Sequence, residues 1–158
     1  MRKSYLIGLA AAIVMVWAGG ANANFVAYND CVYDAAKGQT ISPNATTYNI
    51  GNNSPGPSSG LLKNIATGAN TGVTATLTQT GNPVWQPGDA PDPWATGGSN
   101  CNPGTDADNT FGGIVDVKGV TYYGSSGGWS VTLTLSGLDP AKNYAFATTA
   151  NRNDATYT

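Results

Sequence analysis

The chain has 158 residues, with seven Lys and Arg, nine Asp, no Glu and no His, so its formal net charge is −2. Without a histidine, the chain cannot build a Ser-His-Asp triad, a Cys-His pair or a His-bearing zinc site. Scattered basic residues argue against binding to nucleic acid or anionic lipid, because both need clustered Lys and Arg. Frequent Gly, Asn, Thr and Ser favour an antiparallel β domain over long helices.

Residues 1–23 have the pattern of a secretory signal peptide. Arg2 and Lys3 precede an apolar run at residues 5–18, and an A-x-A site predicts that the mature chain begins at Asn24. The alternative is an uncleaved membrane anchor, but a run of about 14 apolar residues is short for a span. We therefore expect an exported protein (secreted, periplasmic or cell-surface) that does not insert into a membrane after cleavage.

The remaining chain, residues 24–158, predicts a single all-β domain of short strands. Alternating apolar and polar residues or β-formers between turn residues mark these strands, which we place at residues 25–33, 46–50, 73–80, 114–117, 120–123, 130–135 and 144–150. Residues 61–67 fit either a strand or a single helical turn. Residues 114–123 predict a hairpin, and residues 81–104 a long Pro-rich loop of the kind that carries function.

The mature chain has two cysteines, Cys31 and Cys101. In an exported protein an even count favours one disulfide, which would close a loop of about 70 residues and stabilise by roughly 4 kcal/mol. A redox or metal pair is the alternative, but there is no C-x-x-C spacing. The sequence thus predicts a structural Cys31–Cys101 bond.

Aromatic residues supply the candidate ligand site. Trp85 and Trp94 lie in the predicted loop, and Tyr122 and Tyr123 end a predicted strand. Flat, amphipathic rings can stack on sugar faces. The alternative is that such rings belong to the core, which we favour for Trp129. A possible polysaccharide or surface glycan is the partner that this set predicts.

A possible structural Ca²⁺ site lies at Asp106, Asp108 and Asn109. Closely spaced carboxylate and amide oxygens are ligands that Ca²⁺ prefers. No bidentate Glu follows, and the alternative is an Asx-rich turn leading into Phe111.

The segment from Trp129 to residue 151 reads as strand, tight turn, strand, and it carries a resemblance to a known family. Within it, Leu138-Asp139-Pro140-Ala141-Lys142-Asn143-Tyr144 resembles the L-x-P-x-x-x-Y corner of fibronectin type III domains. Similar segments occur in jelly-roll modules of secreted bacterial proteins. The resemblance covers about 23 residues and implies an antiparallel β-sandwich, fibronectin III-like or jelly roll, with an accessory role. It carries no catalytic or ligand residue across.

A central strand at residues 144–150 would need a further strand beside it, so we expect the sequence to be a fragment of a longer reading frame, with further domains possible beyond Thr158. No Asp lies in a recognisable catalytic pattern, so we predict that the segment is not an enzyme. The sequence predicts an exported carbohydrate-binding accessory module. The alternative is a structural spacer or adhesion domain of the cell surface with no small ligand.

Overall fold

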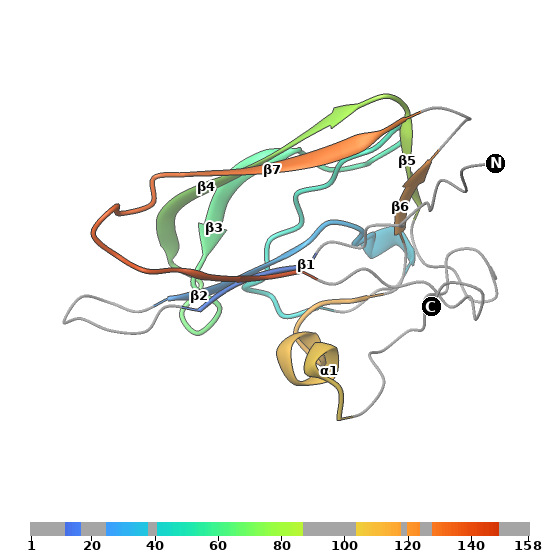
Figure 1. The fold of residues 1–158 in the computed structure, drawn as a ribbon. Coiled ribbons are helices and arrows are strands. Elements are labelled where there is room, and N and C mark those ends of the chain that lie inside the picture. Colours follow the sequence, from blue (N-terminus) through green and yellow to red (C-terminus); the bar gives the residue numbers. More distant parts are fainter. Residues whose placement is uncertain are drawn as a thin grey trace.

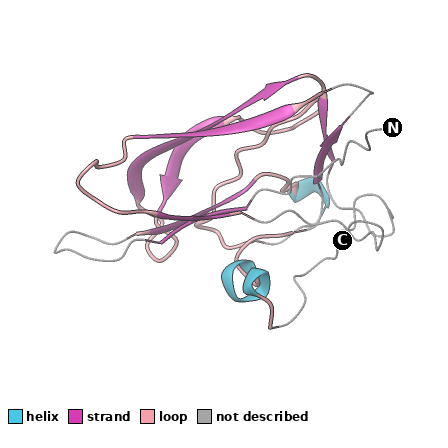
Figure 2. Cartoon of the chain, viewed as in Figure 1, coloured by secondary structure: helices cyan, strands magenta, loops and turns pink. Residues whose placement is uncertain are grey.

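The computed structural model describes residues 12–16, 25–37, 41–86, 104–117, 120–123 and 128–148. Strands dominate these residues, with one short α-helix and one turn of 3-10 helix (Figure 2). The strands are β1 (Ala12–Val16), β2 (Val26–Asp30), β3 (Ser59–Lys63), β4 (Asn70–Thr80), β5 (Pro83–Gln86), β6 (Val120–Tyr123), β7 (Ser130–Ser136) and β8 (Ala145–Ala147). The helices are η1 (Ala35–Lys37) and α1 (Asp106–Phe111).

All the paired strands run antiparallel, which confirms an all-β, antiparallel fold. One sheet has the order β3-β4-β7, a second has the order β2-β1-β8, and β5 pairs with β6. The first sheet lies over the second, and α1 lies on the opposite side of the second sheet (Figure 1).

Strand β2 is buried on both of its faces. Ala27 is fully buried against Leu62, Val73 and other residues of the β3-β4-β7 sheet. Tyr28 points the other way and packs edge-to-face on Phe111 of α1, with ring centroids 6.3 Å apart. Because both faces are covered, the strand shows no simple alternation of apolar and polar residues.

Strands β4 and β7 follow the predicted period-2 pattern. Val73, Ala75 and Leu77 are buried, while the residues between them point outward. In the neighbouring strand, Leu133 and Leu135 pack on the same core cluster. The predicted strands at residues 73–80 and 130–135 are therefore confirmed within longer elements.

Two local predictions were wrong. Only Thr46 of residues 46–50 forms a bridge, to Asn29 of β2. Residues 114–117 are not a strand, and β6 pairs with β5 instead of forming a hairpin with them. Residues 61–67, for which the sequence fits a strand or a single helical turn, combine the end of β3 with a turn, in which the Gly68 N–H donates to the Asn64 carbonyl. For Thr46 and for β6, a partner distant in sequence decides the pairing.

The segment after Trp129 is a corner rather than a hairpin, because β7 pairs with β4 and β8 pairs with β1. Strand β1 comes from the apolar run of the predicted signal peptide and lies between β2 and β8. Among the described residues, no helix has the length and apolar character needed to cross a membrane.

Candidate functional site

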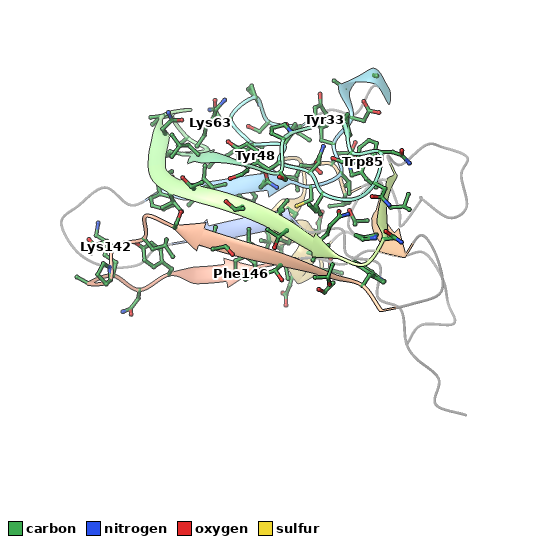
Figure 3. The ribbon with its side chains drawn as sticks, turned by 90° about the horizontal axis from the view of Figure 1, so that it is seen from above. Tyr33, Tyr48, Lys63, Trp85, Lys142 and Phe146 are labelled. Carbon is green, nitrogen blue, oxygen red and sulfur yellow. The ribbon has the colours of Figure 1, made fainter. Side chains whose placement is uncertain are left out.

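Trp85 lies inside the protein, not on an exposed loop. It belongs to β5, its side chain is 6% exposed, and its Nε1–H donates to the Cys31 carbonyl over 3.1 Å (Figure 3). A buried indole needs a partner for its N–H, and this hydrogen bond supplies it. The prediction that Trp85 offers an open ring face to sugar is corrected: its ring packs in the interior.

The other predicted sugar-binding residues are less fully described. Tyr122 and Tyr123 lie in β6, where their Cα partners in β5 are Val84 and Pro83. Trp94 lies outside the described residues. Trp129 precedes β7 and is half-buried. The structure therefore does not bring the four predicted aromatics together into a described platform.

Asn29 holds the segment after Ala45 against β2 through its side-chain amide. The Asn29 Oδ1 accepts from the Tyr48 N–H at 2.8 Å and from the Thr46 hydroxyl at 2.9 Å. Its Nδ2 donates to the Tyr48 carbonyl at 3.0 Å and to the Cys31 Sγ at 3.2 Å. The residue is fully buried, so this set of hydrogen bonds offsets the desolvation of the amide.

Asp30 is a buried carboxyl that joins two distant parts of the chain. Its Oδ1 accepts from the Val32 N–H at 3.0 Å, and its Oδ2 accepts from the Asp116 N–H at 2.9 Å. Burial raises the pKa of Asp30 to about 7, and the nearby Asp116 charge adds to the rise. Hydrogen bonds from the backbone, including that of Tyr33, oppose the shift without cancelling it.

Cys31 is buried and carries a free thiol. The predicted bond to Cys101 is not found, and Cys101 itself lies outside the described residues. Burial raises the pKa of the Cys31 thiol to about 12, the Asp30 charge adds to this, and the Asn29 amide opposes it. A thiol in this setting stays protonated and has little nucleophilic reactivity.

The predicted calcium ligands lie at the start of α1. Thr105 is the N-cap residue, and its hydroxyl accepts from the Asp108 N–H at 3.2 Å. In turn, the Asp108 Oδ2 accepts from the Gly104 N–H at 2.9 Å. This is a capping arrangement that begins a helix rather than an Asx turn.

Asp106 and Asn109 lie in the same short helix and are exposed. Across the part of the chain that the structure describes, no three His, Cys, Asp or Glu side chains gather where they could hold a metal ion.

The outward face of the β3-β4-β7 sheet carries rows of hydroxyl groups. The sequence shows the alternating Ser and Thr residues, but only the strand register shows that they form one surface. Cross-strand pairs include Thr76 with Thr134 and Thr78 with Thr132. Ser59 and Thr76 hydroxyls lie 2.7 Å apart, as do those of Thr80 and Ser130. We define the hydroxyl face as Ser59, Thr74, Thr76, Thr78, Thr80, Ser130, Thr132, Thr134 and Ser136.

Sequence reasoning missed the buried Asn29, Asp30 and Asp116, because nothing in their local pattern marks them as partners across the chain. Comparison of the chain with protein-family models, with curated proteins and with solved structures finds no match.

Proposed function

We propose that the chain is an exported, non-catalytic structural module, a spacer or adhesion domain of a cell surface. One observation carries this proposal: the buried polar groups of Asn29, Asp30 and Trp85 are all hydrogen-bonded to the protein's own main chain. Such groups position loops and strands, and their polar atoms are engaged in contacts within the protein. This favours a structural spacer or adhesion domain, the alternative given by the sequence analysis, over a carbohydrate-binding module.

The proposed architecture is a β-sandwich of fibronectin III-like or jelly-roll type. Two sheets facing each other over a shared cluster around Ala27 support it. The Tyr144 hydroxyl accepts from the Asp139 N–H at 2.9 Å, as the resemblance to a tyrosine corner implies. A rigid, hydrogen-bonded corner suits a module whose role is mechanical or connective.

A non-catalytic role is also supported by the chemistry of the chain. It has no His to act as a general base, and burial keeps the Cys31 thiol protonated at neutral pH.

Fluorescence quenching and affinity electrophoresis test the structural role. In a variant carrying Trp94→Phe and Trp129→Phe, Trp85 is the one tryptophan of the mature chain. We expect acrylamide to quench the fluorescence of Trp85 only weakly. We also expect that polysaccharide in the gel does not retard the protein. Strong quenching that added polysaccharide suppresses, together with retardation, would overturn the proposal.

Glycan recognition remains the second candidate, because the hydroxyl face offers a flat array of donors and acceptors on three paired strands. In that case Thr78→Ala plus Thr132→Ala would abolish retardation in a polysaccharide gel. Ser58→Ala, at an exposed position before β3, serves as the control and would leave retardation unchanged.

A further inference from the structure

Strand β1 fills a slot between β2 and β8 with residues that the sequence predicts to be removed on export. Its register pairs Ala12–Val16 with all five residues of β2 on one side, and with the three residues of β8 on the other. Removal of residues 1–23 would therefore leave two strand edges without the partner that this structure gives them.

The two edges cannot replace β1 by pairing with each other in the same way. Both run antiparallel to β1, so β2 and β8 run parallel to each other. One strand between them implies a separation of roughly 9.5 Å, twice the usual spacing between neighbours. A strand antiparallel to both is the element that fits this gap.

The hydrogen bonds of β2 show which backbone groups face the slot. The Asp30 N–H and the Tyr28 carbonyl bond to Thr46, and the Val26 carbonyl accepts from Ile65, all on the side away from β1. Alternate residues of a strand direct their N–H and C=O groups to opposite sides. The groups that face β1 are therefore those of Ala27 and Asn29, both of which are fully buried.

The surroundings of the slot are apolar. Val26 and Ala147, one from each bordering strand, pack on the cluster that contains Phe111 of α1. On the same strand as Ala147, the large Phe146 side chain is 52% exposed (Figure 3). The segment that fills the slot in this structure, AIVMV, is uncharged and apolar.

We propose that the exported protein binds an extended, uncharged and apolar segment of a partner protein in this slot, as a strand antiparallel to β2 and β8. The inference rests on the proposed structural role and names the kind of partner that such a module would join. Main-chain hydrogen bonds from Ala27 and Asn29 would supply much of the affinity, and the apolar surroundings the selectivity.

Amide hydrogen exchange tests the proposal on the exported protein produced from the full gene. N-terminal sequencing is expected to give Asn24. The probe is a synthetic peptide, AIVMV flanked by two lysines at each end. The control peptide replaces its Met, the residue whose register partner is Ala27, with Pro, which removes a backbone donor. With the probe, exchange at Ala27 and Asn29 should slow by about tenfold or more, whereas Asp30, bonded to Thr46, should not change.

Three results would overturn the proposal. The exported protein could retain residues 12–16, Ala27 and Asn29 could already exchange slowly without the probe, or the probe could leave their fast exchange unaltered. Equal protection by the proline peptide would also contradict strand pairing. The affinity gel reports separately on the structural role, since glycan retardation would remove that role without altering exchange at Ala27 and Asn29.

Discussion

Asp30 should make the protein less stable as the pH rises from about 4 to about 7. Burial raises the pKa of this carboxyl from 3.8 to about 7 in the folded protein. Between these two values the folded state holds a proton that the unfolded state has released, so folding is favoured more strongly at the acid end. The contribution is fully present below about pH 4 and is lost as the pH passes 7. A difference of about 3 pKa units corresponds to roughly 4 kcal/mol of unfolding free energy.

The assay compares wild type with Asp30→Asn by urea unfolding at several pH values between 4 and 8, followed by tryptophan fluorescence. The amide does not titrate, but its nitrogen would face the N–H of Val32 or Asp116, which costs about 1–3 kcal/mol at every pH. We therefore expect the free energy of unfolding of the wild type to exceed that of the variant most at pH 4. This difference should shrink by up to roughly 4 kcal/mol at pH 8. Asp106→Asn, at an exposed position, controls for the loss of one charge. An advantage that stays constant or grows with pH would refute the reasoning.

Three further predictions follow from buried or constrained positions. At pH 8, iodoacetamide should label Cys31 only after unfolding, because its thiol is buried and its pKa is about 12; mass spectrometry showing rapid native labelling would contradict this. Gly137→Ala should destabilise by about 3 kcal/mol or more in a urea titration, since a φ of +83° is strained for Ala and its Cβ would strike a carbonyl of β4. The control Gly104→Ala has a φ of +80° and open space, so a cost of only about 1–2 kcal/mol is expected. Tyr144→Phe should cost about 1 kcal/mol by removing the acceptor of the Asp139 N–H, and an unchanged urea midpoint would argue against a stabilising corner.

Local patterns in the sequence predict the strands that have one buried and one outward face. Val73, Ala75 and Leu77 alternate with threonines, and that alternation alone places β4. The pattern gives no such signal for β2, because Ala27 and Tyr28 are buried on opposite faces. It also misses the hydroxyl face as a surface, because that surface exists only once β4 and β7 are paired in register.

Long-range contacts decide what local patterns cannot. Trp85 reads as a loop residue between prolines, but pairing of β5 with β6 and a hydrogen bond to Cys31 place it in the interior. Asp30 bonds to the N–H of Asp116, 86 residues away, and no local spacing reports such a contact. The Asp-rich start of α1 reads as a turn because the helix has only six residues, and its N-cap at Thr105 is recognisable only after the helix is known.

Strand β2 joins several parts of the fold, so loss of its partner β1 would affect stability. The outer side of this strand bonds to Thr46 and Ile65, its faces contact both core clusters, and its inner side pairs with β1. Loss of β1 would remove the strand partners of the N–H and C=O groups of Ala27 and Asn29, which would then bond to water, at a net loss of about 0.5–1.5 kcal/mol for each hydrogen bond. Four such hydrogen bonds amount to roughly 2–6 kcal/mol, a large share of the stability of about 5–15 kcal/mol that is typical of a small domain. If residues 1–23 are removed and a partner strand fills the slot as we propose, that strand would restore part of this stability as well as join the two proteins.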